Sequence, residues 1–161
     1  MNKILASKKS KVIKVDIEGG RSPQPAFIVM HPEMLSGVDI VHETTKFPYP
    51  FPDNTVTLFM AGHVIEHISR DNKGFVKFMD ECWRCLKEGG QLMLSSYYAG
   101  STPFMSDPTN VNPVTAQTWY YFDPEHPSGL YLRYKPKPWK IERCFWSADG
   151  NMEVLLSKRT I

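Results

Sequence analysis

Four groups of residues in this sequence are of types that can do chemistry. Carboxylates beside glycines can hold an ammonium group, histidines can bind a metal or move a proton, thiols can react or bind zinc, and aromatic rings can wall a pocket. The groups are Asp16–Gly20, His63–His67, the pair Cys82 and Cys85, and the stretch Asp107–Asp123. Which chemistry each supports depends on the elements that position it.

The acidic turn Asp16–Gly20 ends a run of alternating apolar and polar residues at 11–17, which predicts a strand. In an open α/β sheet, ligands bind beyond the carboxyl ends of strands. Glycines at such a point let the backbone approach a ligand closely. The turn is therefore a candidate ligand site, and the alternative is that Gly19-Gly20 is only a tight connection.

His63 and His67 stand four residues apart, with Glu66 between them, after a predicted strand at 55–60. The run has the order of the inverted zinc-protease motif, and two histidines at this spacing on a helix can share a metal. A catalytic zinc needs a third protein ligand, and the later carboxylates lie in predicted loops or strands. A zinc hydrolase is therefore a remote alternative, and no metal site is expected.

Cys82 and Cys85 lie near the end of a predicted helix over 71–87. A reactive Cys-x-x-Cys pair works at a helix N-terminus, where the dipole lowers the thiol pKa, and the opposite end has the opposite sign. Cys82 also belongs to an apolar stripe at helical spacing, formed by Phe75, Met79, Cys82 and Leu86. The pair is predicted to be buried and structural.

The elements that must position these groups follow from the apolar periodicity. Beyond the helix, the sequence predicts strands at 11–17, 26–30, 37–42, 55–60 and 91–98, a short helix at 115–122, and a hairpin of strands 139–146 and 152–158. The order predicts an α/β fold with a single Rossmann-like, mostly parallel sheet and an antiparallel C-terminal hairpin. The connections between the first four predicted strands are too short for full helices, so several early helices of such a fold are expected to be missing or trimmed. One face of the sheet is therefore expected to be exposed.

Composition narrows the class of protein further. A chain of 161 residues is predicted to be one domain spanning 1–161. It has no apolar run of the ~18 residues that a membrane span needs. The lysine-rich start lacks the apolar core of a secretory signal, and three cysteines cannot all pair, so a cytoplasmic location is expected. Basic residues gather at 1–14 and 130–143, which could contact an anionic partner.

Taken in order, these segments resemble the small class I S-adenosylmethionine-dependent methyltransferases of the type-11 methyltransferase domain group. The turn Val15–Gly20 looks like the family's first motif, and 47–56 (FPYPFPDNTV) is similar to its "LPFPDNSFD" loop. The run 63–68 (HVIEHI) looks like its "hxLEHi" segment, and 81–90 (ECWRCLKEGG) matches "E-x-x-R-x-L-K-P-G-G". Asp107–Thr109 resembles the "D-P-T-H-V-R" stretch of one subgroup. The likeness is strongest over 11–123, and the hairpin over 139–158 suits the family's last two strands.

The resemblance implies a Rossmann-like methyltransferase with S-adenosylmethionine as cofactor. Glu18, Gly19 and Gly20 would lie against its methionine part, with Asp16 just before them. His31 stands where the family has an acid for the ribose hydroxyls, and Glu43 matches its acid near the adenine. The implied cofactor-binding residues are Asp16, Glu18, Gly19, Gly20, His31, Glu43, Ala61, Gly62 and His63. Glu18 replaces a glycine of the family motif and is expected to crowd the turn.

The implied reaction is displacement of a methyl group from sulfonium onto a substrate heteroatom. His63 is the first candidate for a catalytic base and Asp107 the second, because both lie beyond strand carboxyl ends. The acceptor is expected to be a small molecule or a nucleic-acid-related compound, since the basic ends suit phosphate and the aromatics near Trp119 suit a planar group. A weakly active or degenerate member, or a non-catalytic binding module, is the alternative. A homodimer would cover the exposed sheet face.

Overall fold

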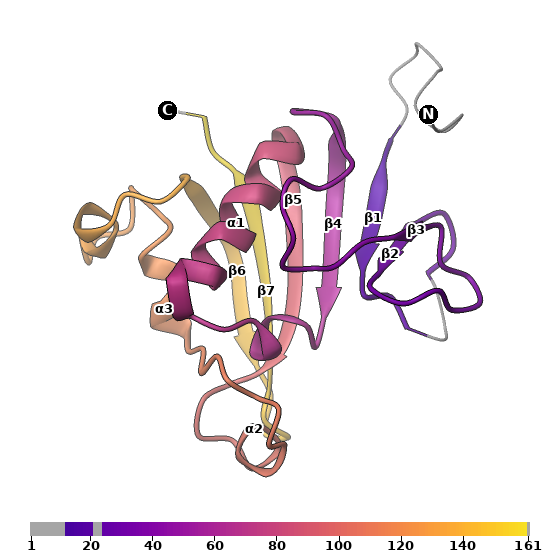
Figure 1. Cartoon of the computed structure of the whole chain (residues 1–161). Coiled ribbons are helices and arrows are strands. Elements are labelled where there is room, and N and C mark those ends of the chain that lie inside the picture. Colours follow the sequence, from indigo (N-terminus) through magenta and orange to yellow (C-terminus); the bar gives the residue numbers. More distant parts are fainter. Residues whose placement is uncertain (1–11, 21–23, 161) are drawn as a thin grey trace.

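A computed structural model describes residues 12–20 and 24–160, so most of the basic segment 1–14 (residues 1–11) lies outside the described residues. Seven strands form one sheet in the order β3-β2-β1-β4-β5-β7-β6 (Figure 1). The strands are β1 (Lys14–Ile17), β2 (Ile28–His31), β3 (Ile40–Val41), β4 (Val56–Gly62), β5 (Leu86–Tyr97), β6 (Trp139–Trp146) and β7 (Asn151–Lys158). All seven predicted strands are therefore present.

The pairing of the strands confirms the predicted fold class. β1 pairs in parallel with β2 and β4, β2 with β3, and β4 with β5. β7 is antiparallel to both β5 and β6. The sheet is thus mostly parallel with an antiparallel C-terminal hairpin. Because two antiparallel steps separate β5 from β6, these strands run in the same direction and end at the same edge as β1 and β4.

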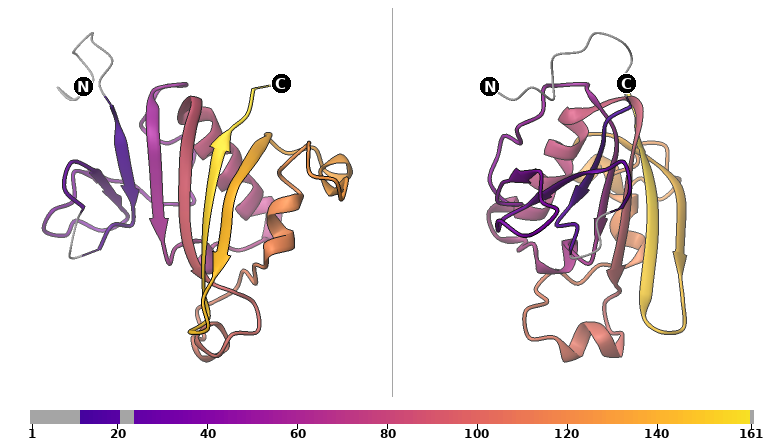
Figure 2. Two further views of the ribbon diagram at one scale, coloured as in Figure 1. Left: turned by 180° about the vertical axis from the view of Figure 1, so that it is seen from behind. Right: turned by 90° about the vertical axis from the view of Figure 1, so that its right-hand side faces the viewer.

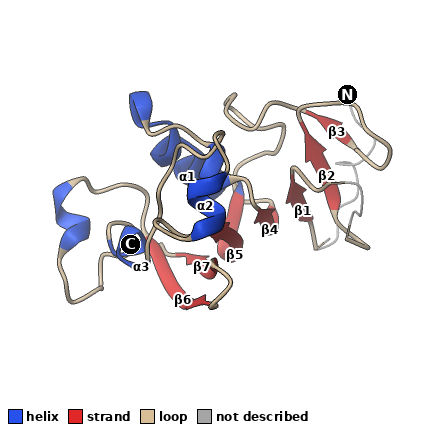
Figure 3. Cartoon of the chain, turned by 90° about the horizontal axis from the view of Figure 1, so that it is seen from below, coloured by secondary structure: helices blue, strands red, loops and turns tan. Residues whose placement is uncertain are grey.

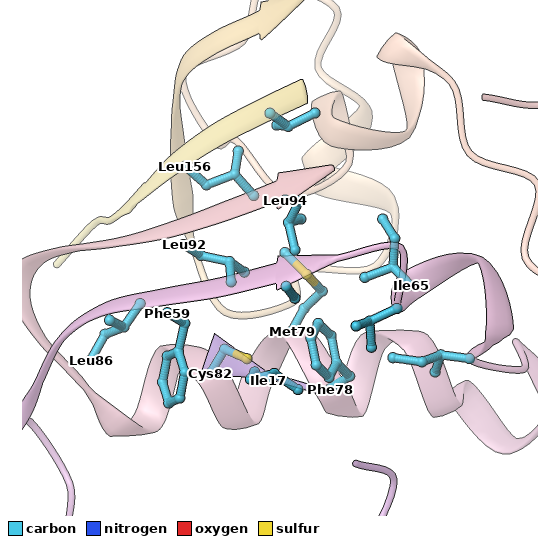
Figure 4. Close-up of a cluster of buried hydrophobic side chains, with 14 of the residues drawn as sticks. Ile17, Phe59, Ile65, Phe78, Met79, Cys82, Leu86, Leu92, Leu94 and Leu156 are labelled. Carbon is cyan, nitrogen blue, oxygen red and sulfur yellow. The ribbon is translucent and has the colours of Figure 1, made fainter. Parts of the chain in front are cut away.

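The helices are α1 (Gly74–Cys85), α2 (Thr102–Ser106) and α3 (Ala116–Tyr120), with 3-10 turns η2 (Ile65–His67), η3 (Asp71–Lys73) and η4 (Leu130–Arg133). The apolar stripe of α1 packs on the sheet, where Met79 and Cys82 face strand residues such as Phe59 and Leu92 (Figure 4). Burying this stripe supplies the main driving force for docking α1.

The prediction that Cys82 and Cys85 are buried and structural is confirmed. Both are free thiols that are 0 % exposed. Burial raises the pKa of the Cys85 thiol to about 12, which keeps it protonated at neutral pH.

The bounds of α1 differ from the predicted helix over 71–87. Asn72 and Lys73 have left-handed backbones (φ 50° and 60°), so the chain turns before the helix starts at Gly74. A Cβ on Gly74 would lie 2.4 Å from the carbonyl oxygen of Ser69, which favours glycine there. At the other end β5 begins directly after Cys85. Gly89 has the expected positive φ (65°) but lies within β5, where the β4–β5 register shifts.

The face of the sheet opposite α1 is uncovered. This agrees with the expectation that the short connections between the first four strands leave no room for helices. Between β1 and β4 the described residues contain no helix, and Figure 2 (left) shows strands with no helix in front of them. Buried residues such as Leu92 alternate with neighbours such as Met93, which is 37 % exposed. No helix in the described ranges is long and apolar enough to span a membrane. The assignment of 1–161 to one domain stays a prediction.

Candidate functional site

A cavity of about 280 Å³ lies on the uncovered face, beside the carboxyl ends of β1, β4 and β5. Figure 3 views the molecule from the side on which these strands end. Strand register places one row of side chains under the cavity, because Asp16 pairs with Met60, Met60 with Met93 and Met93 with Leu155. The row continues to Arg143 on β6. Six of the residues implied by the resemblance line this cavity: Asp16, Glu18, Gly19, Gly20, Ala61 and Gly62.

The turn after β1 explains why glycine is usual in this motif. Glu18 has φ 57°, the left-handed conformation in which a Cβ is disfavoured. Its backbone N–H donates to Met30 O at 2.7 Å, and its carboxylate accepts a hydrogen bond from the Thr44 hydroxyl. The turn therefore holds Glu18 by drawing its side chain towards Thr44. A Cβ on Gly19 would lie 2.5 Å from Asp16 Oδ2, whereas one on Gly20 would meet no atom of the described residues within 4 Å.

Asp16 is a buried carboxylate without a partner in the part of the chain that is described. Asp16 is 5 % exposed, and its carboxylate forms no hydrogen bond or ion pair with any side chain of residues 12–20 or 24–160. Burial raises its pKa because the charged form loses solvation. A cation in the adjoining cavity would restore that lost stabilisation. The Asp16 carboxylate is therefore a suitable acceptor for the ammonium group of a bound amino acid or of S-adenosylmethionine.

His31 and Glu43 do not line the cavity. His31 ends β2, next to the turn, and its Nδ1 accepts from the backbone N–H of Glu33 at 2.9 Å. The acceptor role of Nδ1 leaves the neutral ring a donor at Nε2. Glu43 is exposed in the loop after β3. Its neighbour Thr44, which sequence reasoning missed, is the residue that reaches the turn.

His63 directly follows the cavity-lining Gly62 and has a strained backbone (φ 54°). Its N–H donates to Ser95 O at 2.8 Å, and its ring packs against Tyr97 with centroids 4.5 Å apart. His63 Nδ1 lies 2.9 Å from Glu66 Oε1. The hydrogen bond to Glu66 raises the pKa of His63, burial opposes this, and the negative charge of Glu66 adds to the increase.

The carboxylate of Asp107, the second predicted base, is hydrogen-bonded to Thr109 in its own loop. Its Oδ1 accepts from the Thr109 backbone N–H at 2.8 Å and from the Thr109 hydroxyl at 2.7 Å. These hydrogen bonds lower the pKa of the exposed Asp107 carboxyl. The carboxylate is thus a weaker base than usual, and it organises the turn.

The two histidines of the His-x-x-Glu-His run have different partners. His67 Nδ1 lies 3.1 Å from the Thr109 hydroxyl, whereas His63 is held by Glu66. Among residues 12–20 and 24–160 no three His, Cys, Asp or Glu side chains gather as a metal site would require. The zinc-hydrolase alternative therefore has no third ligand in that part of the chain.

The loop after β5 is fastened to the turn after β4. The backbone N–H groups of Val111 and Asn112 both donate to Glu66 O, at 2.8 and 2.9 Å. The buried Asn112 side chain donates to Ile65 O at 2.8 Å and accepts from Arg70 Nε at 2.6 Å. The stretch that resembles "D-P-T-H-V-R" thus braces the segment that carries His63. The sequence distance of more than 40 residues hid this role from local patterns.

The aromatic stretch lies partly in the core. Trp119 is fully buried and packs edge-on against Phe75, with centroids 6.1 Å apart. Trp119 and Tyr120 also line a second cavity of about 380 Å³, together with Trp146 at the end of β6. Sequence reasoning left open whether these aromatics wall a substrate pocket or pack over the end of the sheet; Trp119 packs in the core, and the cavity beside it is distinct from the one at Gly19–Gly20.

The sheet order, the glycine turn after β1 and the cavity at the strand ends together define a class I, Rossmann-like methyltransferase fold. The methyltransferase domain family model matches residues 2–94, more than half of the chain. The chain therefore belongs to the methyltransferase domain family. A search among curated proteins finds no significant match.

Solved structures share this fold at low sequence identity. One is an S-adenosylmethionine-dependent methyltransferase from Archaeoglobus fulgidus (14 % identity, TM-score 0.63, covering 92 % of this chain and 87 % of that one). Another is the N-methyltransferase NodS from Bradyrhizobium japonicum in complex with S-adenosylhomocysteine (12 %, 0.62, 92 % and 79 %). A third is an S-adenosylmethionine-dependent methyltransferase from Mesorhizobium loti (10 %, 0.60, 91 % and 91 %). The predicted enzyme class and cofactor are confirmed at the level of the family.

Proposed function

We propose that the cavity beside Gly19 and Gly20 binds S-adenosylmethionine and that the chain transfers the methyl group to a heteroatom of an acceptor. The observation that carries this proposal is Asp16, a buried carboxylate facing a cavity at the glycine turn with no partner in the described residues. A carboxylate there would hold the cofactor's ammonium group, as the family resemblance implies. Gly20 leaves open space for close approach.

The other implied residues take supporting roles in this proposal. Ala61 and Gly62 would form the floor, and Glu18, held by Thr44, would form a wall. His31 is kept as the candidate for the ribose hydroxyls, because its Nε2–H is free to donate. Glu43 is kept as the candidate near the adenine, because it follows β3 at the same edge of the sheet.

His63 is the proposed catalytic base, and Asp107 is the second candidate. When bound, S-adenosylmethionine supplies a methyl group: the acceptor's lone pair forms the new bond to carbon, and the carbon–sulfur bonding electrons stay on sulfur. His63 would take the proton that the acceptor loses. The raised pKa of His63 supports this choice, since it makes the ring a better base than the tied Asp107 carboxylate.

The proposed acceptor is a small molecule or a nucleic-acid-related compound. Two features support this range. The described basic segment carries Arg133, Lys135 and Lys137, which suit phosphate. The cavity lined by Tyr120 and Trp146 suits a planar group.

Calorimetric titration of the full chain with S-adenosylmethionine and S-adenosylhomocysteine tests the proposal. Heat at sub-millimolar ligand, with a thermal shift, would support it. Neither heat nor a shift at millimolar ligand would contradict it and favour a non-catalytic module. Elemental analysis in the same preparation checks the zinc alternative, which requires about one equivalent of tightly bound metal.

A homodimer is the arrangement that we propose for the uncovered face. Apolar side chains such as Met93 are exposed there. Arg143 and Glu153 lie 3.9 Å apart on the same face, and each is more than half exposed. A two-fold axis could present the Arg143 of one copy to the Glu153 of the other. Met93, Arg143 and Glu153 also line the cavity proposed for the cofactor, so a dimer through this face would place the partner copy over that cavity. The cytoplasmic location expected from the cysteines stays a prediction.

A further inference from the structure

Glu66 is a buried carboxylate that forms an ion pair with a histidine. It is 1 % exposed, its Oε1 contacts His63 Nδ1 at 2.9 Å, and its Oε2 is buried with no hydrogen-bond partner among the described residues. Burying a charge is unfavourable unless it is paired. Burial opposes ionisation of Glu66, but the hydrogen bond from His63 and further contributions from the Glu66 backbone, the Ser96 side chain and the charge of His63 together outweigh it, and the pKa of Glu66 is lowered. The carboxylate is therefore an acceptor for the imidazole.

The contact determines which nitrogen of His63 carries the proton. An ionised carboxylate can only accept, so Nδ1 must be the donor. In the neutral ring the lone pair is then on Nε2. The His63 side chain is 44 % exposed, so the ring is partly open to solvent. His63 itself does not line the cavity, but its backbone is held next to the cavity-lining Gly62 by the hydrogen bond from its N–H to Ser95 O.

The support behind Glu66 does not depend on its side chain. Val111 and Asn112 are hydrogen-bonded to the backbone oxygen of Glu66. A change confined to the Glu66 carboxylate would leave this brace in place. The energetics of the His63–Glu66 contact can therefore be tested apart from the fold of the loop.

We propose that Glu66 is a positioning residue, which fixes His63 with its proton on Nδ1 and stabilises the imidazolium formed when Nε2 accepts the acceptor's proton. The inference rests on the proposed methyl transfer. The proton leaves the acceptor's N–H or O–H and forms an N–H bond at Nε2. The resulting positive charge lies beside the Glu66 carboxylate, where a low local dielectric strengthens the attraction. His63 remains the catalytic residue, and Glu66 acts through it.

Within residues 12–20 and 24–160, two titratable side chains contact the His63 ring. The ionised Glu66 carboxylate, from η2, accepts a hydrogen bond from the ring and stabilises its protonated form, and the Tyr97 ring, from β5, packs against the imidazole. The pKa of His63 is raised because the hydrogen bond from its ring to Glu66 has a larger effect than burial, which lowers the pKa. Removing the charge of Glu66 while keeping its shape should therefore lower the pKa of His63.

The test is a pH titration of the full chain by ¹H–¹⁵N NMR, which reports both the pKa and the protonated nitrogen of each histidine. In the wild-type protein we expect neutral His63 to be protonated on Nδ1 and to titrate above about 6.5. In Glu66→Gln we expect the midpoint to fall by about one pH unit. Glu88→Gln is the matched control, since it removes the same charge at an exposed position and should leave His63 unchanged.

The wild-type titration alone can overturn the inference. It would be wrong if neutral His63 carried its proton on Nε2, or if it titrated as an ordinary histidine. An unchanged midpoint in folded Glu66→Gln would also overturn it. Calorimetry with S-adenosylmethionine on the wild-type sample separates the two proposals. Absence of cofactor binding contradicts the proposed function, whereas the NMR result decides the role of Glu66.

Discussion

Arg84 forms a bidentate ion pair with Glu81, in which Nε donates to Oε2 at 3.0 Å and Nη2 donates to Oε1 at 2.6 Å. The same Glu81 carboxylate accepts from the backbone N–H of Tyr49 at 2.6 Å, and Arg84 Nη1 donates to Phe51 O at 3.0 Å. The pair therefore fastens the proline-rich loop before β4 to the last turn of α1. This contact gives a physical reason for the "E-x-x-R" spacing of the family.

Breaking this pair should destabilise the fold. In Arg84→Met the mostly buried Glu81 carboxylate loses its bidentate partner, and the loop carbonyls lose a donor. We expect the free energy of unfolding to fall by about 2–4 kcal/mol in urea denaturation. Arg133→Met is the control, because Arg133 is exposed on η4 and should change stability by less than about 0.5 kcal/mol. Equal effects of the two changes would contradict the structural role of the pair.

The same contact predicts a loss of stability in acid. Burial alone would raise the pKa of Glu81, but hydrogen bonds from Arg84 and Tyr49 outweigh it and place the pKa below the ordinary 4.5. A carboxyl whose folded-state pKa is lowered stabilises the protein above its unfolded-state pKa. That contribution is lost as the pH falls from about 4.5 through the folded-state pKa.

Thermal melts between pH 7 and pH 3 measure this effect. Wild-type protein should lose more melting temperature below pH 4.5 than Glu81→Gln, which has no carboxyl to protonate and starts from a lower value. Parallel curves for the two proteins would show that Glu81 is not the group responsible.

The uncovered sheet face predicts self-association. Light scattering should give twice the 18.5 kDa chain mass at micromolar protein, because exposed Met93 and its neighbours are protected from water in a dimer. Met93→Lys should shift the mass towards one chain. Met105→Lys, at an exposed site on α2 that is not part of the sheet, should leave it unchanged. A wild-type mass of one chain would contradict the dimer.

The sheet could be predicted from the sequence because each strand shows its own pattern. The short apolar run at 26–30 and the alternation at 152–158 indicate strands without knowledge of their neighbours. The start of α1 could not be predicted so well. Asp71 has the chemistry of a helix cap, but the left-handed backbones of Asn72 and Lys73 delay the helix to Gly74.

The candidate site divides in the same way. Asp16 and the glycine turn were accessible to sequence reasoning, because a strand end and two glycines are local signals. Thr44 and Asn112 were assigned no role, because their contacts join segments that are distant in the sequence, and Glu66 entered only through the zinc alternative. Glu18 and Thr44 are 26 residues apart, and Asn112 and Ile65 are 47 residues apart. Such pairs are visible only once the strands are placed side by side.

The glycine turn offers the sharpest test of the cofactor site, because its two glycines have different surroundings. A Cβ at Gly20 would meet no atom of residues 12–20 or 24–160 within 4 Å, so Gly20→Val should fold normally. The valine would occupy space in the cavity, and we expect calorimetry to show at least a tenfold loss of affinity for S-adenosylmethionine. Gly20→Ala, with less bulk, should show a smaller loss.

Gly19 provides the contrast at the next position. A Cβ there would lie 2.5 Å from Asp16 Oδ2, so Gly19→Val must displace the carboxylate or the turn. We expect it to lower the melting temperature as well as the cofactor affinity, whereas Gly20→Val lowers the affinity alone. Full binding by folded Gly20→Val would show that the cofactor lies elsewhere. A melting temperature unchanged by Gly19→Val would show that the turn accommodates a side chain at position 19 and would contradict the predicted clash with Asp16.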